Sequence, residues 1–393
     1  MACDNITDIL VQESGRFGPE IYNRVFPTSP WIGLMKRDTF PEGMGHTISN
    51  LTYERSAPTS AEPTWTDITV SDGGTVEGGN CLPTATKVGI ASTTRNFTLK
   101  RRVLEGPDYC VEDLRFKFGL RKQLESQLAI LSEYSRIEWE IRYRHDYFTL
   151  VGNKTIVNGS YKTTGTTTGS TYAAACPTSI LTQGVLNWSK QRLIRDGAIF
   201  GALGKDNGAP VMTLVTSGET SDRLIFENDD IRQDLRWGKP SELLAAYGVE
   251  RSYRGFYHVI DAFPRRFACA AGGHTEVAAF TTAAATKGTK TIVNSSYETA
   301  GFEESVIFHP EVMHSLIPAP ISNPAPNFRF DPNNYLGDWR LKNILDRVCN
   351  PDGTIVYHRG TLAHAAEPVH PERGWAFMHL KCDAVGALVE SCS

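Results

Sequence analysis

The feature that most constrains the fold is a long run of regularly spaced apolar residues between positions 108 and 148. Its members follow one another at steps of three or four residues: Leu120, Leu124, Leu128, Leu131, Tyr134, Ile137 and Ile141. This spacing lays side chains along one face of a helix, so it predicts a single amphipathic α-helix over residues 108–148. At 1.5 Å per residue, roughly 40 residues form a rod of about 60 Å, longer than a small domain is wide. Another part of the chain, or another chain, must therefore lie along it.

The ends and the interior of this segment agree with a helix in water. Asp108 follows a proline and can cap the first turn, while Arg142, Arg144 and His145 bring positive charge to the last turns. Charged residues at every third or fourth position exclude a membrane span. Gly119 costs about 1 kcal/mol relative to Ala and can mark a bend. A core helix of an ordinary domain and one half of a coiled coil are the alternatives.

Composition places the chain among globular proteins with room for two or more subdomains. It has 393 residues and a formal net charge of −4, so strong electrostatic binding of nucleic acid over the whole surface is not expected. The N-terminus lacks a basic region followed by an apolar one, and we expect no secretory signal. The cysteines are scattered without a CxxC pair, which favours free thiols in a reducing compartment. They are Cys3, Cys81, Cys110, Cys176, Cys269, Cys349, Cys382 and Cys392.

Two segments before the long helix predict elements that protrude. The first 39 residues form a predicted arm with an apolar anchor at Trp31, Ile32 and Leu34, and such an anchor needs a surface to dock on. Residues 40–103 contain two polar, β-leaning stretches, GHTISNLTYER and TKVGIASTTRNFTLKRR, joined by a tip rich in Gly, Pro, Ser and Thr. We predict an extended two-stranded hairpin. Because such a hairpin is marginal in water, it must fold back on its own domain or lie on another subunit.

The remainder of the chain alternates helix and strand signals and ends in a β-rich region. A helix is predicted over residues 179–195 and a buried strand over residues 210–217. Strands over residues 354–358 and 375–380 are expected to form one sheet that packs on the long helix, which gives an α+β fold. The stretch KTIVNGSYKT recurs later as KTIVNSSYET. Our hypothesis is that the copies are equivalent strand-turn elements, and a duplicated surface hairpin without function is the alternative.

Patterns for catalysis or cofactor binding are missing from the sequence. It contains no motif of a nucleophilic hydrolase, a zinc protease, a P-loop or a dinucleotide-binding site. The histidines at positions 358, 364, 370 and 379 have neither a helical i, i+4 spacing nor a finger spacing, and prolines interrupt the run. Adjacent acids such as Glu303 and Glu304 point apart and indicate a solvated face. We therefore predict no catalytic, cofactor-binding or metal-binding residues and no enzymatic activity.

The order of these segments resembles the major capsid proteins of tailed double-stranded DNA bacteriophages. The resemblance covers nearly the whole chain and is carried by the stretches PWIGLMKRDTFPEGMG, FTLKRRVLEGPDYCVEDLRFKF, GVERSYRGFYHVID, FHPEVMHSLIPAP and YLGDWRLKNILD. It implies an α+β capsid fold with an N-terminal arm, an extended β-hairpin loop, a long spine helix, a peripheral domain and an axial domain. The implied boundaries are 1–39 for the arm, 40–103 for the extended loop, 104–212 for the first part of the peripheral domain with the spine helix at 108–148, 213–299 for the axial domain and 300–393 for the β-rich return of the peripheral domain.

The same resemblance implies a structural protein that assembles as pentamers and hexamers into an icosahedral shell. Such a shell encloses double-stranded DNA without sequence-specific binding, is assembled in the host cytoplasm, and involves scaffolding, portal and decoration proteins. The residues expected to contact neighbouring subunits are Trp31, Ile32, Leu34, Trp65, Lys100, Arg101 and Arg102. An encapsulin-like bacterial shell protein that holds cargo, and a β-rich adhesin or receptor-binding module, are the alternative functions.

Overall fold

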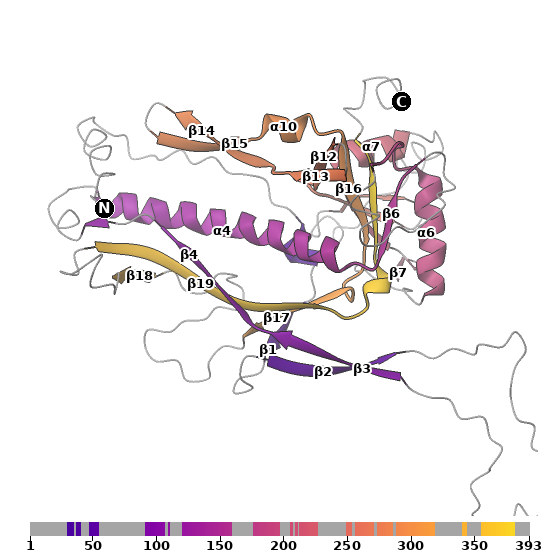
Figure 1. Ribbon diagram of the computed structural model, residues 1–393, viewed down its shortest axis with the longest axis horizontal. Coiled ribbons are helices and arrows are strands. Elements are labelled where there is room, and N and C mark those ends of the chain that lie inside the picture. The colour runs from indigo at the N-terminus through magenta and orange to yellow at the C-terminus, as the bar shows by residue number, and fades with distance from the viewer. Residues whose placement is uncertain are drawn as a thin grey trace, which may run out of the picture.

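The structure is a computed structural model, and it describes the parts of the chain that form the helices and strands in Figure 1. These are residues 30–34, 37–40, 47–54, 91–106, 109–110, 120–158, 176–196, 205–206, 209–210, 212–226, 249–253, 256–270, 273–285, 288–318, 340–343 and 355–381.

Helices and strands alternate along the described chain, with most strands in its second half. The helices are α2 (Trp31–Leu34), α4 (Leu120–Leu150), α6 (Gln183–Arg195), α7 (Gly218–Phe226), α10 (Ser295–Glu298) and the 3-10 turn η1 (Pro371–Arg373). The strands are β1 (Arg37–Phe40), β2 (Thr47–Glu54), β3 (Ala91–Thr98), β4 (Lys100–Glu105), β5 (Tyr109–Cys110), β6 (Asn153–Ile156), β7 (Lys205–Asp206), β8 (Ala209–Pro210), β9 (Met212–Thr216), β10 (Val249–Tyr253), β11 (Phe256–Ile260), β12 (Arg266–Ala270), β13 (Gly273–Val277), β14 (Phe280–Ala285), β15 (Gly288–Val293), β16 (Phe302–Phe308), β17 (Met313–Pro318), β18 (Arg340–Asn343), β19 (Ile355–Pro368) and β20 (Trp375–Leu380).

An eight-stranded mixed sheet forms the centre of the molecule, with helices on both faces. Its path is β10-β11-β9-β16-β12-β13, and β20 joins it through β16 and carries β6. Alternate residues of a strand point to opposite faces. Accordingly, Val306 and Phe308 pack in the cluster that contains α2 and α4, whereas Ile307, Trp375 and Phe377 pack in the cluster that contains α6 and α7. The central strands are buried on both sides because each face is covered.

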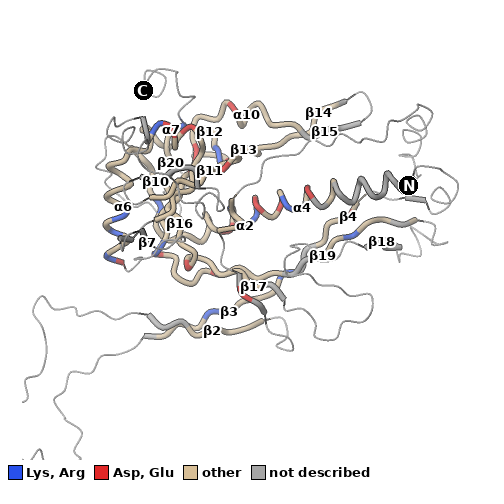
Figure 2. Tube along the Cα trace, turned by 180° about the vertical axis from the view of Figure 1, so that it is seen from behind, with Lys and Arg blue, Asp and Glu red and all other residues tan. Residues whose placement is uncertain are grey.

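A second sheet supports the other side of α4. It has the order β1-β17-β19-β18, and β4 and β5 also pair with β19. Figures 1 and 2 show α4 between the long strand β19 and the β14–β15 hairpin. Trp139 and Tyr143 contact His364 of β19 through their ring edges, at centroid distances of 4.6 and 6.2 Å, and Tyr147 stacks on Phe308 of the central sheet at 4.8 Å. The helix is therefore the element on which both sheets pack.

The helix differs from its prediction in its start and in its buried face. α4 begins at Leu120, and Tyr109–Cys110, expected in its first turn, is the short strand β5. Residues 107–108 and 111–119, with the possible bend, lie outside the described residues. In the described part the buried row is aromatic, at Trp139, Tyr143 and Tyr147, whereas Tyr134 of the predicted row is 53% exposed. Rings bury more area per residue than aliphatic chains, so they take the position between two sheets.

The predicted pairing of the last two strands is wrong. Strand β20 has the expected bounds, but it pairs antiparallel with β16 and parallel with β6 in the central sheet. Strand β19 ends at Pro368, ten residues beyond the end of the predicted 354–358 strand, and belongs to the other sheet. The turn at η1 separates the two strands and changes the chain direction. Which sheet a strand joins is decided by distant partners, which a local pattern does not contain.

The repeated KTIVN stretch forms a strand in both copies, but the surroundings differ. The first copy is β6, inside the central sheet, and the second is β15, in a hairpin with β14. The asparagines that follow also differ in role. Asn158 Oδ1 accepts from the Thr178 N–H at 2.9 Å, whereas Asn294 caps α10 by accepting from the Ser296 N–H at 3.0 Å. The hypothesis of equivalent strand-turn elements is therefore wrong beyond the shared strand.

The central sheet draws strands from three of the segments named in the sequence analysis. β6 lies within residues 104–212, β11, β12 and β13 within 213–299, and β16 and β20 within 300–393. The domain boundaries themselves stay a prediction. Among the described residues, no helix is both long enough and apolar enough to cross a membrane.

Candidate assembly surfaces

The β2–β3 hairpin leaves the body of the molecule (Figure 1). Its strands pair antiparallel from Thr47↔Thr98 to Glu54↔Ala91, which confirms the two predicted strands. The base is fixed by Phe97, which is 1% exposed and packs against residues of β17 and β19. Further out, Leu51 is 53% exposed. The hairpin is thus anchored at one end and presents its outer half to solvent.

Both connections of the hairpin to the body are held by the second sheet. On one side β1 pairs parallel with β17, and on the other β4 pairs antiparallel with β19 over six residue positions, from Lys100↔His364 to Glu105↔Arg359. An ion pair of 3.2 Å between Arg359 Nε and Glu105 Oε1 closes the far end of that register. Because strand pairing fixes direction, the hairpin leaves the body at a defined angle (Figure 1).

The apolar anchor of the arm docks on its own chain. Trp31 and Leu34 are 1% and 7% exposed, and the Trp31 indole N–H donates to Asp261 Oδ2 at 2.7 Å. The Trp31 ring also contacts Tyr147 and Phe308, at centroid distances of 5.6 and 6.1 Å. The expectation that these two residues contact a neighbouring subunit is therefore wrong, because their surfaces are already used inside one copy.

The other predicted contact residues are only partly described. Lys100 is exposed at the start of β4. Arg101 and Arg102 lie on the same strand and Ile32 lies in α2, but their side chains are outside the described set. Trp65 is outside the described residues altogether, as are the first 29 residues of the arm. For these positions a contact with a neighbouring copy stays a prediction.

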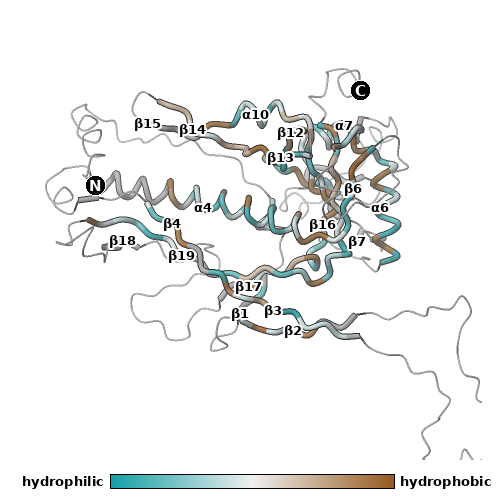
Figure 3. Tube along the Cα trace, viewed as in Figure 1, coloured by the Kyte–Doolittle hydropathy of each residue, from teal (hydrophilic) through white to brown (hydrophobic). Residues whose placement is uncertain are grey.

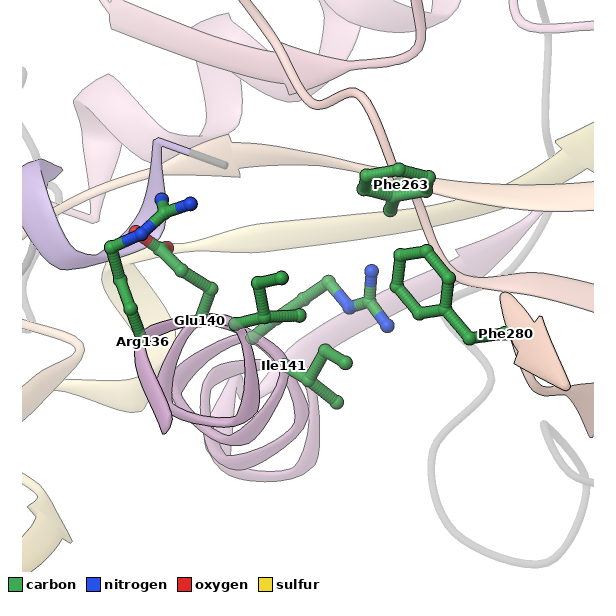
Figure 4. A pocket seen from close by; sticks show the side chains of 7 residues that line it. Arg136, Glu140, Ile141, Phe263 and Phe280 are labelled. Atoms are coloured by element: carbon green, nitrogen blue, oxygen red, sulfur yellow. The ribbon is translucent and has the colours of Figure 1, made fainter. Parts of the chain in front are cut away.

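The middle of α4 is incompletely covered. Ile130 is 47% exposed and Tyr134 is 53% exposed. Further along the helix a small pocket separates α4 from the β14 region (Figure 4), where Phe263 and Phe280 face the helix with ring centroids 4.6 Å apart. The pocket is lined by Arg136, Ile137, Glu140, Ile141, Arg144, Phe263 and Phe280. Mixed apolar and charged walls without a convergent set of titratable groups do not indicate a catalytic site.

Two consecutive arginines at the start of β12 hold the layers together. On the α4 side, Arg265 contacts Glu304 and Glu276, each at 2.7 Å, and Arg144 of α4 lies 3.9 Å from Glu276. Burial alone would raise the pKa of the Glu276 carboxyl, but the hydrogen bond and charge of Arg265, together with Arg144, lower it. The Glu276 carboxylate is therefore ionised at neutral pH, and the chain of charges ties the helix to the central sheet.

On the opposite side of the sheet, Arg266 is surrounded by carboxylates. Its guanidinium lies 3.1 Å from Glu219, 3.4 Å from Glu298 and 3.7 Å from Glu303, and it stacks over the Tyr297 ring at 4.6 Å. These contacts join α7 and α10 to β16. Since a buried ion pair offsets much of its own desolvation cost, its main effect here is to fix geometry.

The adjacent acids of β16 are buried, which corrects the prediction of a solvated face. Glu303 is fully buried and Glu304 is 4% exposed. Glu303 Oε1 accepts from Ser217 Oγ at 2.6 Å and from Thr220 Oγ1. The side chains do point apart, as expected for neighbours on a strand, but both faces of this strand are covered. The sequence contained a signal for this network: a pair of arginines and a pair of glutamates in segments that read as strands.

Cys176 and Cys269 form a disulfide, so the prediction of free thiols is wrong for this pair. Their Cα atoms are 6.2 Å apart, and the bond joins the chain just before α6 to strand β12. The two residues are separated by 93 positions in sequence. Scattered cysteines can pair in space without any short motif, which is why spacing did not reveal them.

The histidines predicted not to bind metal are spread over different surroundings. His364 packs on Trp139, His379 Nε2 lies 2.8 Å from Ser305 Oγ, and His370 Nδ1 lies 3.1 Å from Glu372. Within the described ranges, no group of three or more metal-ligating side chains occurs. The described histidines therefore take part in packing and hydrogen bonding.

Comparison with known proteins gives the fold a precedent. No protein-family model and no curated protein sequence matches the chain. Solved structures do: the capsid asymmetric unit of cyanophage Pam1 matches with a TM-score of 0.57 at 6% identity, over 94% of this chain and 97% of that one. This chain has a phage capsid fold.

Two further capsid structures are similar over nearly their full length. The capsid of Ralstonia phage GP4 matches with a TM-score of 0.51 and 10% identity, over 94% of this chain and 96% of that chain. The acid-stable capsid of Helicobacter pylori bacteriophage KHP30 matches with a TM-score of 0.50 and 8% identity, over 97% and 99%. The capsid fold is therefore shared although few residues are identical.

Proposed function

We propose that this chain is the major capsid protein of a tailed double-stranded DNA phage. Many copies form pentamers and hexamers that tile an icosahedral shell around the genome, in the host cytoplasm and then in the virion. Contacts that recur with a closing rotation produce a closed shell from one kind of subunit. Scaffolding, portal and decoration proteins are further partners of such a shell.

One observation carries this proposal: a capsid fold over 94% of the chain that includes a hairpin projecting from the body. A two-stranded hairpin is marginal on its own, and among its described residues only those at the base pack on the same chain. The outer half of the hairpin is stabilised when it lies on a neighbouring copy. The role is mechanical, and the shell encloses DNA without reading its sequence.

Assembly of the purified protein tests this function. We expect the full chain to sediment as rings or shells and to show them in negative-stain images. A variant in which residues 55–90 are replaced by a short Gly-Ser turn keeps β2, β3 and the Phe97 anchor, so it should stay folded. Without the hairpin tip it should remain unassembled. The control is a scan of thermal unfolding, which should show similar stability for both proteins.

Two results contradict the proposal. A full chain that stays monomeric at high concentration removes the shell function, and a tip variant that still forms shells removes the role of the hairpin. The contents of purified particles separate the two kinds of container. Packaged protein in place of DNA would indicate an encapsulin-like shell.

A further inference from the structure

The outer side of α6 carries an exposed row that the core does not use. Gln191 and Arg192 lie three and four residues after Trp188, and Arg195 lies four and three residues after them, so all four share one side of the helix. The opposite side is buried against the central sheet. Trp188 is 37% exposed, one of the few large apolar side chains with that much exposure among the described residues. A surface of this composition needs an explanation.

The charge of this helix is one-sided. Its sequence, QGVLNWSKQRLIR, contains three cations and no acid, in a chain of net charge −4. Figure 2 shows these cations in the half of α6 that lies away from α7. Lys190 Nζ lies over the Phe256 ring at 5.2 Å, so the outward charge comes from Arg192 and Arg195. Cations near a helix C-terminus favour the helix dipole, but the dipole does not account for the exposed tryptophan beside them.

The tryptophan of this row is held in place from below. The Trp188 ring meets the ring of Trp375 edge-on at a centroid distance of 5.2 Å, and the buried Trp375 indole N–H donates to Thr155 Oγ1 at 2.9 Å. A fixed aromatic ring beside arginines is the composition found at the energetic centre of protein–protein interfaces. It loses little conformational entropy on binding. This favours a protein partner over nucleic acid.

The same molecule carries a surface of the opposite sign. Three carboxylates, of Glu219, Glu298 and Glu303, face the single guanidinium of Arg266. The two on α7 and α10 reach the surface, since the Glu219 side chain is 35% exposed and the Glu298 side chain is 56% exposed. The surface of α7 and α10 therefore presents these two carboxylates, together with the Lys381 ammonium, which donates to the Glu298 carbonyl oxygen at 2.6 Å.

We propose that Trp188, Arg192 and Arg195 of one copy dock on the acidic surface at Glu219 and Glu298 of the next copy. This rests on the proposed assembly and names one contact that forms it. In the proposed ring this contact runs head-to-tail, from the α6 row of one copy to the α7 and α10 surface of the next, which is the kind of contact that closes a ring. Two chains of like net charge repel at a distance, and complementary patches select the orientation in which they meet.

Charge neutralisation on α6 tests the contact. R192Q/R195Q lowers the net charge by 2, and T281E/T282E, at exposed positions of β14, lowers it equally. We expect R192Q/R195Q to need at least a tenfold higher protein concentration to assemble in sedimentation velocity, while the β14 control behaves like the wild type. Oxidative labelling of Trp188, read by mass spectrometry, should fall when the wild type assembles.

A charge swap tests the acidic partner. R192E/R195E should abolish assembly, and addition of E298K to this variant should restore part of it, with thermal unfolding recorded for each protein. Normal assembly of folded R192E/R195E, unchanged labelling of Trp188, or a folded triple variant without recovery overturns the contact. Normal assembly with weaker binding of a 30-bp duplex also overturns it and indicates DNA on this face. In all these cases the wild type assembles, whereas a monomeric wild type refutes the shell function itself.

Discussion

We expect removal of the disulfide between Cys176 and Cys269 to lower thermal stability by a predictable amount. The bond links residues 93 positions apart. For a loop of that length, the chain-entropy treatment gives a loss of about 15.6 cal/mol/K in the unfolded chain, or about 4.6 kcal/mol at 25 °C. With an unfolding entropy of about 2.1 cal/mol/K per residue, this corresponds to a fall in Tm of about 5 to 6 °C. Measured values are often smaller than this treatment gives, so a fall of about 2 to 6 °C is the expected range.

The assay compares wild type and C176S/C269S by scanning calorimetry after incubation with oxidised glutathione, with and without a reductant. The wild type should lose stability on reduction, and the double variant should not respond. That control separates this pair from the other six cysteines. Peptide mass spectrometry under non-reducing conditions should find the two cysteines linked. An unchanged Tm of the wild type on reduction, or full alkylation of both thiols in the oxidised native protein, would refute the reasoning.

Three further predictions concern the core. Trp31→Ala removes a 1% exposed ring and should lower the free energy of unfolding, measured by chemical denaturation, by about 3 to 5 kcal/mol. Tyr134→Ala, at a 53% exposed position, should change it by about 0.5 kcal/mol or less. Similar losses for the two variants would contradict this prediction. Burial lowers the pKa of His379 in the folded protein. As the pH falls below about 6.5, the unfolded chain therefore binds a proton that the folded protein does not bind, and the free energy of unfolding decreases. Between pH 8 and 5, the Tm from thermal scans should fall less steeply for His379→Gln than for the wild type. Parallel curves of Tm against pH would argue against this role of His379. Gly374→Ala places a Cβ 2.8 Å from a methyl group of Val312 and should lower the free energy of unfolding by about 1 to 3 kcal/mol. Gly301→Ala, in open space, should be nearly neutral. Denaturation midpoints in the reverse order would contradict the close packing at Gly374.

The elements that sequence predicted well are those set by local composition. The β2–β3 hairpin follows from two alternating polar stretches around a tip rich in turn residues, and β20 follows from a short apolar run bounded by turn signals. Both depend on neighbours within a few residues. The resemblance in segment order also predicted the capsid fold, at a level where only 6% of residues are identical to a structure of the same fold.

Choices between distant partners could not be predicted. The sheet that a strand joins depends on which strand lies beside it. For this reason β19, beside β17, and β20, beside β16, belong to different sheets. The buried face of α4 was misjudged because a row of aliphatic residues and a row of aromatic residues have the same helical spacing. Glu303 and Glu304 were assigned to solvent because their partners, Arg265 and Arg266, are far away in sequence.

The 14 residues of β19 have a consequence for how the molecule bears force. β3 continues into β4 with one residue between them, and β4 lies antiparallel along β19 over six positions. A force that pulls the β2–β3 hairpin along its length would load the backbone hydrogen bonds between β4 and β19 in shear. These hydrogen bonds would then have to break together. The β2–β3 hairpin is thus attached to the body along the length of β4. In the proposed shell, a force from a neighbouring copy would reach the whole subunit before this attachment breaks.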